Sequence, residues 1–309
     1  MTDRVLVAAY GTGLLRTEIR RGAAGTCRWR RTPGPLAPRP FVPVPAPHLL
    51  AELRRLGDRD AGPASAGRLV TGTPDGGSRV YDVDGAESLA ALLLREGPVP
   101  AAESALRSVG RTLARLHALK PGPGFPTAPA RGAERLLRRL TADGAGTGPD
   151  AGAPGQRTDV LLRDRLGPRR WSALRRWCAL TVEDRRYPVL SHGAPGLGSA
   201  VPVADGDGTA GAELLTGEDL CLAPWYLDLG WVAGELIELC WQCGGDFGKW
   251  QALLDALEEG YGREPGTPWS RAAAVRIALH LHDYGAYVAA LPDAEVRRYA
   301  DFLAYLIDL

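Results

Sequence analysis

The chain has 309 residues, of which 45% are hydrophobic, and its 37 basic and 36 acidic residues leave a formal net charge of +1. This length is enough for one large domain or two lobes with a substantial core, and the balanced charge argues against general attraction to nucleic acid. No apolar run approaches the roughly 20 residues of a membrane span, and no signal peptide is visible. Five scattered cysteines do not suggest a disulfide framework. We therefore expect a cytoplasmic protein without nucleic-acid or membrane partners.

The first part of the chain alternates short apolar runs with turn residues. Between residues 4 and 31, glycine turns at 11–13 and 22–25 separate three such runs, which predicts a meander of three strands. The proline-rich segment 32–47 can form neither a helix nor a central strand, so we expect an extended connector there.

A helix and two further strands are expected next. Apolar residues at helical spacing in 48–56 stop at Gly57, which predicts a short helix. Residues 68–71 and 78–83 are predicted as two strands across a Pro-Asp-Gly-Gly turn, because β-branched residues flank a strong turn signal.

Helical periodicity dominates the rest of the chain. Helices are predicted at 87–95, 101–119, 134–140, 171–180 and over most of the chain from 225 onward. Short strands at 200–203 and 211–215 flank a turn that contains Asp205 and Asp207, where aspartate is favoured by turn geometry alone. Residues 141–157 lack periodicity and are predicted to form a mobile surface loop.

Strands first and helices afterwards is a segregated α+β order, with a hinge near residues 82–87. We expect two lobes: a strand-rich lobe at 1–85 and a helical lobe at 86–309.

One motif points to a family. The stretch from Leu190 to Val201, LSHGAPGLGSAV, resembles the catalytic loop of the aminoglycoside phosphotransferase family, which reads roughly His-Gly-Asp-Leu-His-Pro-Gly-Asn-Val. Residues 219–236, with their Asp228-Leu-Gly-Trp segment, are similar to the family's segment after its metal-binding strand. The helix ending in Leu116-His117 is similar to the helix that precedes the catalytic core. The resemblance implies a bilobal, protein-kinase-like α+β fold.

The positions that carry the family's chemistry differ here. In the loop, Ala194 takes the place of the catalytic Asp and Ser199 that of the metal-binding Asn. Alignment backward from Asp228 without gaps places Thr216 at the metal-binding Asp, and a neutral hydroxyl is a weak ligand for Mg²⁺. A kinase-like site also needs a cation on the third strand to hold the phosphates.

That cation cannot be a lysine, because the only two lysines are Lys120 and Lys249. Arg28 and Arg30, where the third strand is expected, are the candidates to replace it, since arginine binds phosphate as a planar fork. Gly11 and Gly13 occupy the place of a phosphate-covering glycine loop, although two glycines also suit any hairpin.

Other side chains near the motif have competing interpretations. Glu218 and Asp219 could replace the missing metal ligand after a slip of two or three residues. His192 could have a catalytic role, but a histidine that holds the loop by internal hydrogen bonds is the simpler reading. Asp228 is expected to cap the helix that starts at residue 229. Glu52, which resembles the residue that pairs with the family's lysine, is expected to be a solvated helix charge.

The Cys240-x-x-Cys243 pair resembles a metal or redox motif. A structural zinc site needs about four ligands, and only His280 and His282 offer themselves at a distance. We therefore expect these cysteines to pack as small apolar residues and predict no metal site. Arginine-rich helices at 135–139 and 169–176 are expected to be solvated faces.

Taken together, the altered positions predict a pseudokinase. We expect no ATP or Mg²⁺ cofactor and a non-catalytic binding or scaffold role, with a partner enzyme, a peptide or a small substrate in the interlobe cleft. The alternative is a divergent ATP- and Mg²⁺-dependent phosphotransferase that acts on a small molecule or, with a partner lyase, on Ser/Thr of a precursor peptide. The Ala-, Arg- and Gly-rich composition is typical of a GC-rich genome. In GC-rich actinobacteria, kinases of this resemblance occur in natural-product pathways.

Overall fold

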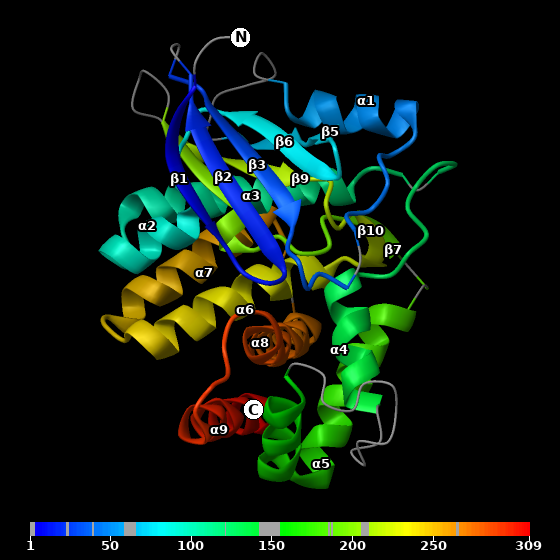
Figure 1. Ribbon diagram of the computed structural model, residues 1–309, viewed down its shortest axis with the longest axis vertical. Coiled ribbons are helices and arrows are strands. Elements are labelled where there is room, and N and C mark those ends of the chain that lie inside the picture. The colour runs from blue at the N-terminus through cyan, green and yellow to red at the C-terminus, as the bar shows by residue number, and fades with distance from the viewer. Residues whose placement is uncertain are drawn as a thin grey trace.

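The protein is described from a computed structural model, which covers residues 4–22, 25–38, 40–58, 66–120, 122–141, 155–184, 186, 188–204, 210–263 and 266–309. An antiparallel sheet of five strands forms one end of the molecule, in the order β1-β2-β3-β6-β5 (Figure 1). Its strands are β1 (Val5–Gly11), β2 (Leu15–Arg21), β3 (Cys27–Pro33), β5 (Thr73–Asp75) and β6 (Ser78–Val83). The predicted meander is confirmed, since β1, β2 and β3 are consecutive neighbours.

A second sheet joins the two parts of the chain. It has the order β4-β9-β8, with β4 (Arg68–Thr71), β8 (Ala200–Ala204) and β9 (Ala210–Thr216). The pairing of β4 with β9 is parallel, so a strand from the first 85 residues lies beside one from the catalytic-loop region.

The expected arrangement of 68–71 and 78–83 across one turn is therefore wrong. The glycine turn at Gly76-Gly77, both with positive φ, connects β5 to β6 instead. Gly72 separates β4 from β5: its N–H donates to the Thr216 carbonyl, and a Cβ there would lie 2.7 Å from the Tyr81 ring. Glycine is therefore required at position 72, because the Tyr81 ring leaves no room for a side chain there.

Helices make up most of the remainder. They are α1 (Pro47–Leu56), α2 (Leu89–Glu96), α3 (Pro100–His117), α4 (Arg131–Thr141), α5 (Gln156–Glu183), α6 (Tyr226–Cys243), α7 (Phe247–Tyr261), α8 (Thr267–Tyr287) and α9 (Asp293–Asp308). Every predicted helix is present. The segment predicted at 171–180 is part of the longer α5, which is interrupted at Gly167 by a non-helical backbone and continues after Pro168.

The predicted loop at 141–157 is helical at both ends, and residues 142–154 lie outside the described residues. Two further strands, β7 (Pro188–Ser191) and β10 (Cys221–Pro224), pair with each other on either side of the catalytic-loop motif. The sequence did not reveal them, because each has four residues and contains a proline.

Three apolar cores hold these layers together. One lies among α1, α3, α7 and the β4-β9-β8 sheet, and a second among α4, α5, α8 and α9. The third is small and lies between the five-stranded sheet and β8-β9. The α+β class with a strand-rich N-terminal part and a helical C-terminal part is confirmed. The lobe boundary at residue 85 stays a prediction, since β4 hydrogen-bonds with β9 across it.

Within the described residues, no helix is long and apolar enough to cross a membrane.

Candidate functional site

The His192–Gly193 loop is held by one buried carboxylate. Asp228, in the first turn of α6 and fully buried, accepts the backbone N–H of His192 at 2.7 Å and that of Gly193 at 3.0 Å. The Nε2 atom of His117, the last residue of α3, lies 2.9 Å from the same carboxylate, and its Nδ1 contacts the Tyr261 hydroxyl. Asp228 therefore anchors a loop 35 residues away in sequence. The expected role as a helix cap is wrong, because its partners lie outside α6.

The charge of Asp228 is stabilised in place. Burial opposes its ionisation, but the hydrogen bond and charge of His117, with contributions from His192, lower the pKa of Asp228 on balance. Hydrogen bonds from N–H groups to a charged carboxylate are strong where water is excluded, so Asp228 stabilises the position of the loop.

Gly193 has no alternative at its position. Its φ of +90° is in the left-handed region, and a Cβ there would lie 2.0 Å from the Asp219 carbonyl oxygen. The loop and the segment after β9 therefore touch backbone to backbone. His192 adds a second link, since its Nε2 donates to the Leu215 carbonyl at 2.7 Å. His192 has the structural contacts that its simpler interpretation expects.

The side chains expected to carry chemistry meet in a different arrangement. Arg31 of β3 reaches Ser199 Oγ at 3.1 Å and Glu218 at 3.2 Å, and the Tyr81 hydroxyl donates to Glu218 at 2.8 Å. The side chains of Arg31 and Glu218 are 11% and 8% exposed, so this is a buried ion pair. Burial raises the pKa of Glu218, although Arg31 opposes that shift.

The arginine that contacts Ser199 and Glu218 is Arg31, for which the sequence predicted no role. Arg28 and Arg30 alternate onto the opposite face of β3, where they pair with Asp82 and Asp75. The signal was available: in a strand of period two, an inward Trp29 requires an inward Arg31.

Trp29 fills the space beside that ion pair. It is completely buried against Ile19, Tyr81, Val83, Val201 and Leu215, and its Nε1 donates at 2.9 Å to the carbonyl of Gly85, in the segment that joins the lobes. Gly85 itself packs so closely that a Cβ would lie 2.5 Å from Val201. The region between the sheet and β8-β9 is thus occupied by an indole.

The other candidate positions are accounted for as follows. Thr216 is fully buried and, within the described residues, its hydroxyl has no hydrogen-bond partner. Ala194 is partly buried and offers no polar group. The Asp219 carboxylate pairs with Arg131 of α4 at 2.9 Å, and its charge also acts on Arg31. Asp205 and Asp207 lie outside the described residues.

The glycine turn of the β1–β2 hairpin is packed against the helical part. The Gly13 N–H donates to the Tyr287 carbonyl at 2.6 Å, and its carbonyl accepts from Leu36 N–H at 2.8 Å. A Cβ on Gly13 would lie 2.9 Å from the Tyr287 oxygen, and one on Gly11 would lie 2.8 Å from the Arg16 side chain. In this conformation the Gly13 amide serves packing, and the phosphate-binding role of these glycines stays a prediction.

The part of the chain that the structure describes contains no group of three or more side chains suited to a metal ion. Cys240 is partly buried and Cys243 is exposed at the end of α6, while His280 bonds to Glu238 and His282 to Asp159. These four side chains do not converge as a ligand set. The Glu218 carboxylate contacts Arg31 directly, and it has two partners, Arg31 and Tyr81.

No family model matches the sequence, and no curated protein matches it. Solved structures do resemble it. Ethanolamine kinase from Plasmodium vivax gives a TM-score of 0.52 at 11% identity, over 100% of this chain and 82% of that one. Spectinomycin phosphotransferase APH(9)-Ia, in complex with ADP and spectinomycin, gives 0.51 at 9% identity, over 99% and 93%. ADP-bound aminoglycoside phosphotransferase APH(2'')-Ib gives 0.50 at 8% identity, over 99% and 93%.

The chain therefore has the kinase-like fold seen in the aminoglycoside phosphotransferases and in ethanolamine kinase. At these identities, the similarity defines the fold and leaves the activity to be argued from the site.

Proposed function

We propose that this protein is a phosphotransferase-like pseudokinase that acts as a non-catalytic binding or scaffold subunit. The observation that carries the proposal is the filling of the interlobe region by the chain's own side chains. Trp29 occupies the apolar part, and the Arg31–Glu218 ion pair occupies the polar part.

The indole of Trp29 makes the contacts that a nucleotide base would need. A flat bicyclic ring between apolar walls, with an N–H directed at a backbone carbonyl, satisfies both the apolar surface of Val201 and Leu215 and the Gly85 oxygen. A purine could enter only if Trp29 left, which would expose a large buried aromatic and leave the Gly85 carbonyl without its partner.

The polar part lacks the groups that phosphoryl transfer requires. Ala194 can neither orient nor deprotonate a hydroxyl, and loss of a general base alone typically costs about 10²–10⁴ in rate. The hydroxyls of Ser199 and Thr216 are weak ligands for a hard cation. Because Glu218 neutralises Arg31, neither group is free to meet Mg²⁺ or phosphate without separating a buried ion pair. These residues do not fit a magnesium–nucleotide complex.

One observation favours a second candidate, a divergent phosphotransferase. Arg31, Ser199 and Glu218 converge from three separate elements on the place where a phosphate-binding cation and two metal ligands are expected. An enzyme using them would act on a small molecule or on Ser/Thr of a precursor peptide. The composition that suggests a GC-rich genome is the support for placing either candidate in an actinobacterial natural-product pathway.

A phosphotransfer assay separates the two candidates. The purified chain is incubated with γ-labelled ATP, Mg²⁺ and hydroxyl-bearing acceptors: aminoglycosides, choline, ethanolamine and Ser/Thr peptides. The pseudokinase proposal expects neither transfer nor hydrolysis above the protein-free rate, for wild type and for the Ala194→Asp/Thr216→Asp double variant. Transfer by wild type that disappears in Glu218→Gln would instead establish the divergent enzyme.

A further inference from the structure

Strand β1 is an exposed edge strand without charged side chains. It is the outermost strand of the five-stranded sheet, and its sequence, VLVAAYG, contains no charge and no proline (Figure 1). Val5, Leu6 and Tyr10 are 71%, 51% and 52% exposed. Among the described elements, β1 packs mainly on β2. An edge of this kind presents a row of unpaired backbone N–H and C=O groups to a partner.

The other edge strands of the described chain are shorter or interrupted. The opposite edge of the same sheet, β5, has three residues, including Pro74 and Asp75. Four-residue β4, and the proline-containing strands β7, β8 and β10, form the remaining edges. Short strands and prolines are the usual protection of sheet edges against pairing. Only a register shift between Leu6 and Ala8 interrupts β1, which leaves its second half regularly paired.

Positive charge accompanies this edge. Residues 5–33 contain six arginines and one acidic residue, Glu18, in a chain whose net charge is only +1. Four of the six arginines have carboxylate partners. Arg16 and Arg21, at the two ends of β2 and both exposed, have no ion-pair partner within the described residues.

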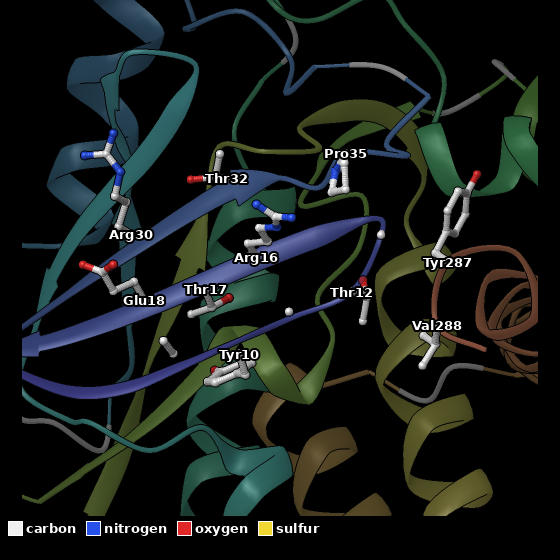
Figure 2. A pocket seen from close by; sticks show the side chains of 13 residues that line it. Tyr10, Thr12, Arg16, Thr17, Glu18, Arg30, Thr32, Pro35, Tyr287 and Val288 are labelled. Atoms are coloured by element: carbon white, nitrogen blue, oxygen red, sulfur yellow. The ribbon is translucent and has the colours of Figure 1, made fainter.

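A groove runs beside the second half of β1. It has a volume of about 660 Å³, and its lining includes Ala9 and Gly11 of β1, Tyr287 at the end of α8, and three charged residues of the next strands: Arg16, Glu18 and Arg30. Glu18 pairs with Arg20 and Arg30 with Asp75, which leaves Arg16 as the charge in this lining without an ion-pair partner among the described residues. Figure 2 shows Arg16 and Arg30 extending from the same side of the strands, with Tyr287 and Val288 near the hairpin turn. Gly11 has no side chain and Ala9 a small one, so the groove is open toward the edge at these two positions, and Tyr10 and Thr12 complete its lining there.

We propose that β1 and this groove form a docking site for an extended, acidic peptide segment of a partner, which adds to the sheet as a sixth strand. The proposal deepens the binding role proposed above and rests on it only for the existence of a polypeptide partner. Backbone hydrogen bonds along β1 supply the pairing, and Arg16 selects an acidic side chain.

The geometry defines which groups pair. The Thr12 N–H donates to the Leu15 carbonyl. Because hydrogen-bonded pairs alternate along an antiparallel ladder, the backbone N–H and C=O groups of Tyr10 and Ala8 also point toward β2. The N–H and C=O groups of Ala9 and Gly11 then point outward. Gly11 lies opposite Arg16, and a docked strand would run two strand spacings, roughly 9.6 Å, from β2. A glutamate on that strand and Arg16 could meet across the bare Gly11.

A designed peptide tests the proposal directly. The probe is a fluorescein-labelled peptide of roughly ten residues that alternates valine or threonine with glutamate. We expect saturable anisotropy binding to the full-length protein, weakened at high salt, with hydrogen-exchange protection appearing at the Ala9 and Gly11 amides. The matched probes are the same peptide with lysine for glutamate and one N-methylated at alternate residues, and neither should bind.

Three variants locate the site. Ala9→Pro removes an outward N–H that β2 does not use and should weaken binding about tenfold, the effect of roughly one net hydrogen bond. Ala9→Ser retains the N–H and should bind like wild type. Arg16→Glu should weaken binding at least as much as Ala9→Pro, whereas Arg176→Glu, an exposed charge on α5, should not change it.

Four results would overturn the proposal: no binding at millimolar peptide, equal binding of the N-methylated peptide, indifference to Ala9→Pro, or equal binding of a single-stranded oligonucleotide. A wild-type dimer that Ala9→Pro converts to a monomer would assign the edge to a second copy of this chain instead. None of these outcomes depends on ATP, so failure here leaves the phosphotransfer test unaffected.

Discussion

Two regions that meet at the interlobe boundary differ in what they retain. The loop at His192–Gly193 is held by buried hydrogen bonds to Asp228, which His117 also contacts. The face opposite, on β3 and after β9, presents Trp29 and the Arg31–Glu218 pair in place of open reactive groups. The difference shows that a loop can be held rigidly by buried hydrogen bonds while the side chains that face it are paired with one another.

The largest expected effect concerns the filled face. Trp29→Ala removes a fully buried aromatic ring and should lower the free energy of unfolding by about 3–5 kcal/mol. Urea denaturation monitored by circular dichroism measures this, and added indole should recover part of the loss by binding in the cavity. A loss below roughly 1 kcal/mol would mean that Trp29 does not fill the interlobe region, and the comparison would fail there.

Substitution of Asp228, which holds the His192–Gly193 loop, should lower stability almost as much. Asp228→Ala leaves the His192 and Gly193 amides and His117 without their acceptor, so we expect a loss of about 3 kcal/mol. Because the pKa of Asp228 is lowered in the folded protein, its contribution is present above the unfolded value of about 3.9 and is lost as pH falls below it. The stability gap between wild type and Asp228→Ala, measured by urea titration, should therefore shrink toward pH 3. A pH-independent gap would contradict a charged Asp228.

The backbone contact between the two faces can be tested with a matched pair of glycines. Gly193→Ala should destabilise by about 2 kcal/mol or more, since it combines a positive φ with a Cβ 2.0 Å from the Asp219 oxygen. At Gly198, further along the same loop, a Cβ meets open space, so Gly198→Ala should stay within about 0.5 kcal/mol. Equal melting temperatures for the two variants would show that the loop does not touch the segment after β9.

The ion pair should give the smallest net effect. Arg31→Met leaves Glu218 buried without its cation and should cost about 2 kcal/mol at pH 7, whereas Arg31→Met/Glu218→Met should recover most of that loss. The pKa of Glu218 is already raised by burial, and loss of Arg31 raises it further. The free energy of unfolding of Arg31→Met should therefore fall as pH rises through the raised pKa of Glu218. The variant should be closer in stability to wild type at pH 4 than at pH 7. If the effects of the two substitutions were additive, Arg31 and Glu218 would not interact.

Local patterns predicted much of this fold and less of its site. The meander, the helices and the motif around His192 follow from periodicity, turn residues and a short resemblance. The pairing of β4 with β9 and the bond from Asp228 to the loop join distant segments, and no local pattern reports such contacts.

The residues Ala194, Ser199 and Thr216 were visible in the sequence, but the buried Arg31–Glu218 pair and the burial of Trp29 were not. The phosphate-binding role of Arg28 and Arg30 stays a prediction, but Arg31 is the arginine of β3 that faces Ser199 and Glu218. Side chains alternate along a strand, so a buried Trp29 predicts that Arg31 points to the same face and that Arg28 and Arg30 point to the opposite one.

The central claim is that the interlobe region is filled by the protein itself, and nucleotide binding tests it most directly. Thermal unfolding of the wild-type chain is measured with and without millimolar ATP and Mg²⁺. A ligand at 100 times its Kd stabilises by about 2.7 kcal/mol, which gives a shift of several degrees. The filled region predicts an unchanged melting temperature. A magnesium-dependent rise in melting temperature, absent with Mg²⁺ alone, would contradict it.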